Sequence, residues 1–202
     1  MKAPLFFASR NLDKVRELRE ILLSYRIALH SLRDFADCPE TVEDRDTIYG
    51  NAIKKAIEGA KFTGMLTLAD DTGLFITALE GSPGIFSARW AGEGCSYQDN
   101  RAKILLQMQG QENREAYFET AVALADRDGL ISVVSGRVRG KITESERGES
   151  GFGYDSIFEV EGPGQTYAQM SDAQKNYLSH RGLATHAILP ILKRILDIEE
   201  KE

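Results

Sequence analysis

Cysteine, proline and long apolar runs are all scarce in this sequence. It holds 2 cysteines, Cys38 and Cys95, and 5 prolines in 202 residues. Two cysteines this far apart exclude a small disulfide-stapled scaffold, and no apolar stretch approaches the ~20 residues of a membrane-spanning helix. The amino-terminal segment MKAPLFFASRNLDK lacks the apolar run and the cleavage pattern of a signal peptide. We therefore expect a cytoplasmic, reduced protein without a membrane partner.

Positive charge is also in deficit. The 25 Lys and Arg residues against 31 Asp and Glu residues give a net charge of -6 and a pI near 5.2. This balance argues against nucleic acid as a partner, because nucleic-acid binding needs a basic face. A small anionic substrate is compatible with it, provided that a few cations gather locally or a metal is supplied. The composition is that of a globular protein, and without repeats or linkers we expect a single domain over residues 1–202.

Several nucleotide and catalytic signatures are missing. The sequence contains no G-x-x-x-x-G-K-[ST] phosphate-binding loop and no G-x-G-x-x-G dinucleotide fingerprint. It has no G-x-S-x-G nucleophile elbow. The histidines His30, His180 and His186 lack the spacing of a zinc site.

Apolar periodicity predicts the elements. Strands are expected at 5–8, 27–32, 65–69, 74–78, 117–125, 130–138 and 157–160, and helices after Asn11, after Thr47, at 98–108, after Ser171 and at about 179–198. The strand at 65–69 is expected to end in the turn Asp70-Asp71-Thr72-Gly73, and Pro190 to kink or split the last helix. Asp128-Gly129 indicates a hairpin. Interleaved strands and helices with a central hairpin favour an α/β fold with a mixed sheet.

Two clusters near strand ends carry candidate chemistry. Ser9-Arg10-Asn11-Leu12-Asp13-Lys14 connects a strand to a helix, where free N–H groups bind anions. Asp70-Asp71 follows a strand, and oxygen-rich sites there suit Mg²⁺. Because strand residues alternate faces, the two carboxylates should not both point into one cleft. A plain helix cap and a hydrogen-bonded turn are the structural alternatives.

Two further clusters contain aromatic rings and cations. In SERGESGFGYD, Phe152 or Tyr154 could stack on a base between close-approaching glycines; otherwise the segment is a surface loop. Lys175-Asn176 and Ser179-His180-Arg181 precede or open a helix, where a bound anion would offset their unfavourable interaction with the helix dipole. A polar helix start is the alternative. The four cations near element ends, which together fit a triphosphate, are Lys14, Arg89, Lys175 and Arg181.

The sequence resembles the inosine triphosphate pyrophosphatase family over nearly its whole length. The segments that carry the resemblance are FFASRNLDKVREL, LADDTGLFITALEGSPGIFSARWAG, GFGYDSIF and KNYLSHRGLA. The resemblance implies hydrolysis of ITP, dITP and XTP to the monophosphate and pyrophosphate with Mg²⁺, which cleanses the nucleotide pool. It also implies an elongated mixed β-sheet flanked by helices, two lobes around a central cleft, and a homodimer.

The family motifs can be carried over residue by residue. Its Ser/Thr-x-Asn-x-x-Lys pattern is met within Ser9-Arg10-Asn11-Leu12-Asp13-Lys14, which the resemblance implies holds the triphosphate. Its Asp-Asp-Ser-Gly becomes Asp70-Asp71-Thr72-Gly73, so Asp71 matches the catalytic base and metal ligand, and Thr72 a phosphate contact. The other matches are Phe152, Gly153, Tyr154 and Asp155 in the base-binding loop, and Lys175, His180 and Arg181 as further nucleotide contacts.

Two positions depart from the family pattern. The family's second metal carboxylate precedes a Thr-Phe-x-Glu-Asn-Ala segment, which here reads TIYGNA with Gly50 in place of Glu. Counting back, Glu43 is the best match for this ligand, with Asp44 or Glu40 as alternatives. The family's Gly-Phe-Gly-Tyr-Asp-Pro ends here in Ser156, which should loosen that loop.

The matched residues predict metal-assisted hydrolysis. Asp71 and Glu43 would hold Mg²⁺, Asp71 would accept a proton from water, and cations such as Lys14 and Lys175 would stabilise the leaving pyrophosphate. Donors from Arg181 or the loop backbone would favour a base with an acceptor at C6. One alternative is a nucleotide pyrophosphatase with another base preference, such as modified pyrimidines. Another is a non-catalytic nucleotide-binding sensor, which only Gly50 and Ser156 support.

Overall fold

The computed structural model describes residues 3–198 and divides into two compact units. The first unit comprises Met1–Asp71, Thr120–Gly136 and Arg181–Glu202, and the second comprises Thr72–Glu119 and Arg137–His180. Three strands contribute residues to both units, and each unit has its own hydrophobic cluster. The expectation of a single domain over the whole chain stays a prediction.

Among the described residues, seven strands form one mixed sheet. The strands are β1 (Ala3–Phe7), β2 (Ile27–Ser31), β3 (Thr67–Ile76), β4 (Pro83–Gly84), β5 (Glu115–Asp126), β6 (Gly129–Ile142) and β7 (Phe158–Val160). Their order is β2-β1-β3-β5-β6-β7, with β4 paired to β3. β1 runs parallel to β2 and β3, whereas the β3–β4 and β6–β7 pairs are antiparallel.

Helices flank this sheet, which confirms the predicted α/β class. They are α1 (Leu12–Ile21), α2 (Ile48–Thr63), α3 (Tyr97–Gln107), α4 (Asp172–Leu178) and α5 (His180–Leu196). Short 3₁₀ helices lie at Leu22–Ser24, Leu32–Asp34, Thr77–Leu79, Ser87–Arg89 and Tyr167–Gln169. The side chains of Asn11, Thr47 and Ser171 cap α1, α2 and α4, as their sequence positions predicted.

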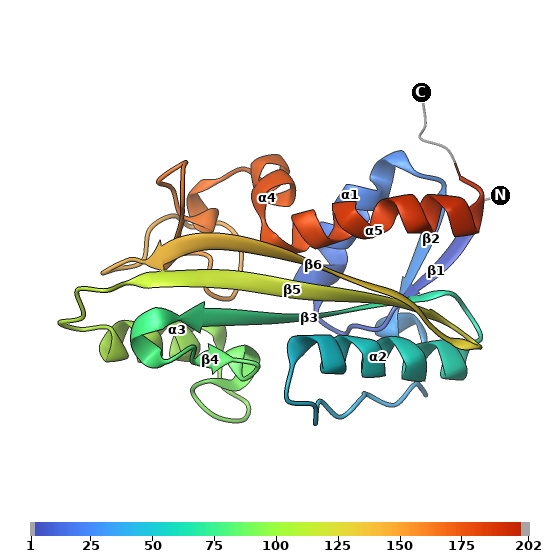
Figure 1. The fold of residues 1–202 in the computed structure, drawn as a ribbon, viewed down its shortest axis with the longest axis horizontal. Helices are drawn as coiled ribbons and strands as arrows, with labels where there is room; N and C mark the ends of the chain where they lie inside the picture. Colours follow the sequence, from blue (N-terminus) through green and yellow to red (C-terminus); the bar gives the residue numbers. More distant parts are fainter. Residues whose placement is uncertain (1–2, 199–202) are drawn as a thin grey trace. The chain divides into compact units, whose positions relative to one another are not determined.

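In the first unit, helices cover both faces of the sheet (Figure 1). α1 and α5 pack on the face to which Leu5 and Phe7 point, because alternate strand residues share a face. α2 packs on the opposite face through small residues. A Cβ on Gly59 would lie 3.0 Å from the Phe6 ring, so glycine here lets α2 approach β1 closely.

The core of the second unit is aromatic. Phe118 of β5 meets Phe158 of β7 edge-on, with ring centroids 4.8 Å apart, and Tyr167 stacks on Phe158 at 5.5 Å. Ile104 of α3 joins the same cluster. Tyr154 also belongs to it, so the glycine-rich loop is anchored in the core by one of its own side chains.

The end of β3 was predicted wrongly. The strand does not end before Asp70 but continues to Ile76. Asp and Gly are depleted in strands, and this is why the pattern indicated a turn. β1 ends at Phe7, which pairs with Leu68, so Asp70 and Asp71 lie just beyond the carboxyl end of β1 instead of at the end of their own strand.

Helix α5 differs from its prediction as well. It runs unbroken from His180 to Leu196 with Pro190 inside, so the expected split does not occur. A proline removes one helical hydrogen bond and crowds the preceding turn. Burial of Ile188, Leu189 and Leu192 in the core of the first unit offsets that cost and holds both halves of the helix in place.

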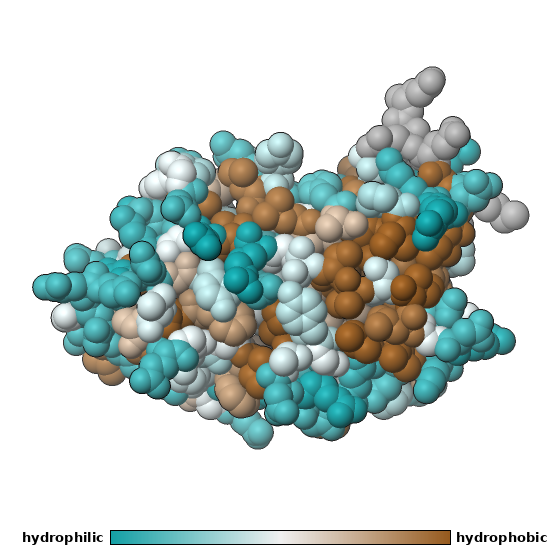
Figure 2. Space-filling view, in the orientation of Figure 1, coloured by the Kyte–Doolittle hydropathy of each residue, from teal (hydrophilic) through white to brown (hydrophobic). Residues whose placement is uncertain are grey.

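The first unit also carries an apolar surface. Figure 2 shows apolar residues gathered between α5 and α2, over β5 and β6. Leu130 and Ile131 of β6 are 43% and 37% exposed. β7 pairs with β6 only over 140–142, so the earlier part of β6 presents an open edge in the described part of the chain. Within residues 3–198, no helix has the length and apolar character that crossing a membrane requires.

Candidate active site

Asp70 and Asp71 are consecutive on β3 and point toward opposite faces of the first unit's sheet. Asp70 bonds to side chains of α1 and α5, and Asp71 bonds to side chains of α2. This agrees with the expectation that neighbouring strand carboxylates point in different directions. The two acids can therefore play different chemical roles.

Asp70 is buried among cations. Its Oδ1 accepts a hydrogen bond from Lys14 Nζ at 2.9 Å, and its Oδ2 accepts one from Arg181 Nε at 2.9 Å. Arg181 Nη1 donates to Glu17. Burial alone would raise the pKa of Asp70, but Lys14 and Arg181 outweigh it and hold that pKa well below its usual range. Asp70 thus stays ionised and orients Lys14.

The Asp71 carboxylate is hydrogen-bonded to one cation, whereas that of Asp70 is hydrogen-bonded to two. Its Oδ2 accepts a hydrogen bond from Asn51 Nδ2 at 3.2 Å, and its Oδ1 accepts one from Lys55 Nζ at 3.3 Å. Burial raises the pKa of Asp71, although Lys55 and Lys14 act in the opposite direction. A carboxylate with a raised pKa is a better proton acceptor near neutral pH.

Glu43 shares a cation with Asp71. Lys55 Nζ donates to Glu43 Oε1 at 2.7 Å as well as to Asp71. Burial disfavours the Lys55 ammonium, but Asp71 and Glu43 outweigh this and raise the pKa of Lys55. The two carboxylates that the sequence proposed as metal ligands therefore converge on one positive group.

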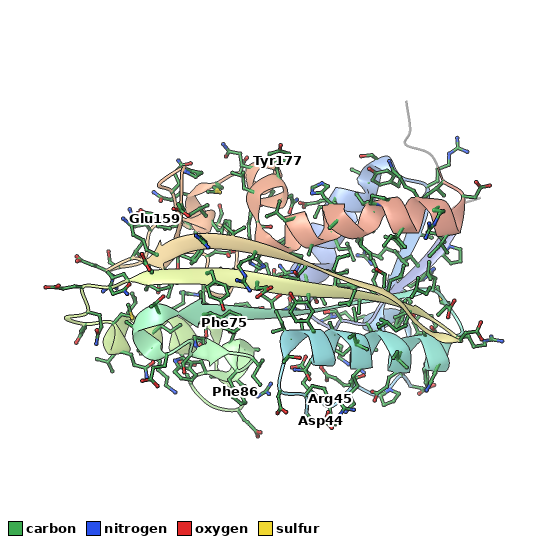
Figure 3. The ribbon with its side chains drawn as sticks, viewed as in Figure 1. Asp44, Arg45, Phe75, Phe86, Glu159 and Tyr177 are labelled. Atoms are coloured by element: carbon green, nitrogen blue, oxygen red, sulfur yellow. The ribbon has the colours of Figure 1, made fainter. Side chains whose placement is uncertain are left out.

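The alternative acids have other partners. Asp44 Oδ1 lies 2.9 Å from Lys54 Nζ, and Glu40 lies 3.8 Å from Arg10. Figure 3 shows Asp44 and Arg45 on the side of α2 away from β3. Arg10 also donates to the Cys38 carbonyl at 3.0 Å and so holds the acidic loop of residues 36–46, which precedes α2. This geometry favours Glu43 over Asp44 and Glu40.

The donor set fits a magnesium ion. Residues 3–198 contain no group of three or more His, Cys, Asp or Glu side chains arranged to hold a metal. Mg²⁺, however, is usually held by one or two carboxylates together with waters and substrate phosphates. Glu43 Oε1 and Asp71 Oδ1, at 2.7 and 3.3 Å from the same nitrogen, match that requirement.

The start of α1 is capped more fully than expected. Asn11 Oδ1 accepts the backbone N–H groups of Asp13 at 3.0 Å and Lys14 at 3.2 Å. Ser9 Oγ accepts the N–H of Asn11 at 3.3 Å. Side-chain caps thus bind these amides, as the helix-cap alternative describes, and anion binding by this segment stays a prediction. Leu12 is exposed, and Lys14 Nζ remains the main positive group of this segment.

In the second unit, Asp155 organises the glycine-rich loop. Its Oδ2 accepts the Phe152 N–H at 2.7 Å and a hydrogen bond from Lys175 Nζ. Lys175 Nζ also lies 4.5 Å from the centre of the Phe152 ring. Gly151 has φ +79°, and a Cβ there would fall 2.2 Å from Asp155 Oδ2, so this turn requires glycine. The predicted residues Phe152, Asp155 and Lys175 therefore form one cluster.

Tyr154 and His180 are core residues. Tyr154 is 6% exposed and its hydroxyl donates to the Ser87 carbonyl at 2.7 Å, so Phe152, which is half-buried, is the better candidate for stacking on a base. His180 is 4% exposed and stacks on Phe118 with centroids 4.5 Å apart. Thr72, the residue after Asp71 on β3, is half-buried.

The loop around Ser156 is braced, although the sequence suggested that it is loose. Ser156 Oγ donates to Glu146 Oε2 at 2.8 Å, and Arg101 Nε donates to the same oxygen at 2.9 Å. Arg101 Nη1 then donates to the Gly153 carbonyl at 3.0 Å. A chain of hydrogen bonds thus replaces the rigidity that proline would supply.

Four residues of these clusters were missed from the sequence: Glu17, Asn51, Lys55 and Arg101. Glu17, Asn51 and Lys55 are buried polar residues on helices. Asn51 and Lys55 interrupt the small apolar stripe of α2 at i, i+4 spacing, which puts them on one face. That interruption was a usable signal. Arg101 gave none, because an arginine on a polar helix face is usually solvated.

Comparison with known proteins gives a consistent result. The model of the Ham1 family matches residues 5–191. A dITP/XTP pyrophosphatase from Geobacter sulfurreducens is 44% identical over 182 residues, which cover 89% of this chain and 92% of that protein. One from Desulforamulus reducens is 42% identical over 193 residues, covering 95% and 96%. A solved HAM1 protein from Coxiella burnetii aligns with a TM-score of 0.84 at 34% identity, covering 95% of this chain and 99% of that one.

Proposed function

The chain belongs to the Ham1 family, and from this premise we propose that it hydrolyses noncanonical purine nucleoside triphosphates, namely ITP, dITP and XTP, to the monophosphate and pyrophosphate. It is then a hydrolase acting on acid anhydrides that cleanses the nucleotide pool. The observation that carries the proposal is the convergence of Glu43 and Asp71 on one cation in the first unit. The names of the relatives support the substrate class.

Asp71 and Glu43 are the residues that would hold Mg²⁺. A bound Mg²⁺ ion polarises phosphate oxygens and lowers the pKa of a coordinated water. Asp71 is the proton acceptor for the attacking water in this proposal, and its buried setting supports that role. Asn51 and Lys55 keep the Asp71 carboxylate in one orientation.

The triphosphate is assigned to the residues at the start of α1. Lys14 supplies the charge, and Asp70 holds its ammonium in place. Ser9, Arg10, Asn11, Leu12, Asp13 and Thr72 complete the proposed phosphate contacts. Positive charge fixed before the reaction stabilises negative charge on a leaving pyrophosphate without reorganisation. A contact of Lys175 with the phosphates stays a prediction.

The base is assigned to the glycine-rich loop. Hypoxanthine and xanthine carry an acceptor at C6, whereas adenine carries a donor, so adenine would leave buried donors unpaired at a cost of ~1–3 kcal/mol each. Arg181 already donates to Asp70 and Glu17, and the Phe152 N–H already donates to Asp155, which favours the backbone N–H groups of Gly153 and Tyr154 as the source of those donors. Phe152 offers the stacking surface.

An assay of pyrophosphate release tests the proposed activity and its base preference. The purified chain is incubated with ITP, XTP, GTP, ATP and a modified pyrimidine triphosphate, with added inorganic pyrophosphatase and phosphate detection. We expect rapid release from ITP and XTP, slow release from ATP, and none in EDTA. Faster turnover of the pyrimidine triphosphate than of ITP and XTP would show that the enzyme prefers another class of base. Nucleotide binding without turnover would make the chain a sensor.

We further propose that the protein works as a homodimer on free nucleotides in the cytoplasm and not on nucleic acid. The open, apolar edge of β6 supports self-association, because exposed apolar patches commonly mark interfaces. The acidic net charge of -6 supports a free nucleotide over a nucleic acid. Light scattering after size exclusion should give twice the 22.5 kDa of one chain.

A further inference from the structure

The first turn of α2 packs against the loop that carries Glu43. Arg45, two residues after Glu43, comes so close that a Cβ on Gly50 would lie 2.8 Å from Arg45 Cβ. Two carbon atoms do not tolerate that distance, and the Arg45 atom is fixed to the backbone rather than at the tip of a flexible side chain. Any larger residue at position 50 would therefore push this loop away from α2.

Asn51 uses this close approach. Its Oδ1 accepts the backbone N–H of Arg45 at 3.0 Å, and its Nδ2 donates to Asp71 Oδ2 at 3.2 Å. The residue is 1% exposed. Because its acceptor end is bound to a backbone N–H, the amide presents its donor end to Asp71. One side chain thus bonds both to the loop and to the candidate general base.

The next turn of α2 holds the same loop. Lys55 Nζ donates to Glu43 Oε1 at 2.7 Å, and Lys54 Nζ donates to the Val42 carbonyl at 2.8 Å. Asn51 and Lys55, four residues apart, lie on one helix face. The loop is therefore attached to α2 at four successive residues. Val42 and Asp44 are bound by Lys54, Glu43 by Lys55, and Arg45 by Asn51.

We propose that Asn51 is a positioning residue for the reaction, which sets the spacing between Glu43 and Asp71 by bonding Arg45 and Asp71 with a single amide. The inference rests on the proposed function, in which those two carboxylates hold the metal. Gly50 contributes by admitting Arg45 to the helix surface. The departure from the family pattern at this position is then part of the loop's packing and not a sign of lost catalysis.

The test compares Asn51→Ala with Asn100→Ala. Asn100 is a matched control, because it is 2% exposed, its Oδ1 accepts the Ala91 N–H at 2.8 Å and its Nδ2 donates to the Ala88 carbonyl at 3.1 Å. Partners that orient metal ligands typically change activity or metal affinity by about 10–100-fold when removed. We expect losses in that range for Asn51→Ala, in kcat with ITP more than in KM, and weaker binding of Mn²⁺ measured by electron paramagnetic resonance without nucleotide.

Asn100→Ala should lower the melting temperature at least as much as Asn51→Ala, because Asn100 Oδ1 also accepts from Cys95 Sγ at 3.3 Å. It should leave kcat and Mn²⁺ affinity within about two-fold of the unaltered protein, because its bonds lie outside the candidate metal site. If Asn51→Ala and Asn100→Ala changed kcat and Mn²⁺ affinity equally, the role of Asn51 would be purely structural and the proposal would be overturned.

A second variant covers the case in which Asn51→Ala does not fold. Gly50→Ala leaves the amide intact and displaces Arg45, and Ala is the better helix former. We expect kcat and Mn²⁺ affinity to fall by about 10-fold in a variant that stays folded, because the higher helix propensity of Ala offsets part of the cost of displacing Arg45. Unchanged kcat and Mn²⁺ affinity would contradict the proposal. Failure of the proposed function and failure of the positioning role of Asn51 give different results. If the proposed function is wrong, the unaltered protein turns over no triphosphate. If only the positioning role is wrong, the unaltered protein is active and the variants bind Mn²⁺ as it does.

Discussion

At the scale of single residues, Asp70 and Asp71 are adjacent in the chain, but their carboxyl groups have opposite pKa shifts. Both are buried, and burial raises the pKa of each carboxyl. Asp70 meets Lys14 and Arg181 directly, so its pKa ends below the usual range, whereas the pKa of Asp71 ends above it. Acids whose environments push their pKa values apart are typical of sites that move protons.

Turnover tests the role of Asp71. Asp71→Asn keeps the volume but removes the proton acceptor and a charged metal ligand, so kcat with ITP should fall by about 10²–10⁴-fold. Binding of α,β-methylene-ITP, measured by calorimetry, should persist. Asp128→Asn in the exposed hairpin turn is the control and should leave both quantities unchanged. Near-full activity of Asp71→Asn would remove this residue from its proposed role.

The pH dependence of the free energy of unfolding tests the ion pairs of Asp70. At pH 7, Asp70→Asn should lower the free energy of unfolding by about 3–5 kcal/mol, because it leaves Lys14 and Arg181 short of a buried counter-charge. The pKa of Asp70 is lower in the folded than in the unfolded chain. Its stabilising effect is therefore complete above the ordinary pKa of about 4 and is lost as pH falls toward the folded-state pKa.

Urea unfolding at pH 7, 5 and 3 measures this effect. The difference in free energy of unfolding between the unaltered protein and Asp70→Asn should be the same at pH 7 and pH 5. At pH 3 this difference should be smaller by about 1 kcal/mol. A difference that stays constant down to pH 3 would contradict the assigned ion pairs.

At the scale of elements, glycine-dependent contacts place the segments that carry function. Gly59 lets α2 approach β1, and Gly50 lets the Glu43 loop approach α2. In the second unit, Gly151 makes room for the Asp155 carboxylate. A Cβ would collide with a neighbour at Gly50 and Gly151 and would make a tight contact at Gly59, so a side chain at any of these positions forces its neighbours to shift.

Substrate affinity tests the brace of the glycine-rich loop. Ser156→Ala removes the hydrogen bond to Glu146 and should raise KM for ITP about 2- to 10-fold, since one such bond contributes about 1 kcal/mol. kcat should change little, because the loop is assigned to the base. Ser150→Ala, at an exposed position of the same loop, is the control. A fall in kcat with KM unchanged would argue against this assignment.

At the scale of the whole molecule, an acidic chain must bind a polyanion. The net charge is -6, and two cations of the candidate site in the first unit are already paired, Lys14 with Asp70 and Lys55 with Glu43 and Asp71. Long-range attraction for a triphosphate is therefore weak without a divalent cation.

Calorimetry at two ionic strengths tests this balance. EDTA should weaken binding of α,β-methylene-ITP by about 10-fold or more at low ionic strength, and less in high salt, because salt screens the repulsion from the acidic chain. The same affinity with Mg²⁺ and with EDTA at low ionic strength would contradict a metal-bridged site.

Much of the architecture was predictable. The strand at 5–8, the caps Asn11, Thr47 and Ser171 and the Asp128-Gly129 hairpin follow from local periodicity and capping chemistry, and all are confirmed. The length of β3 was not predictable, because an Asp-Asp-Thr-Gly run reads as a turn until its buried partners are known. The unbroken α5 was missed for the same reason, since packing outweighs the local effect of Pro190.

The amino-acid sequence by itself determined the order of elements, the family and the chemical types of the candidate residues, since these depend on spacing along the chain. Only the tertiary structure decided which acids share a cation and which are neutralised. Lys55 joins Glu43 and Asp71, while Arg181 joins Glu17 and Asp70, across separations of 12, 16, 164 and 111 residues. Charge interactions depend on distance in space, and local sequence patterns carry no information about it over such separations.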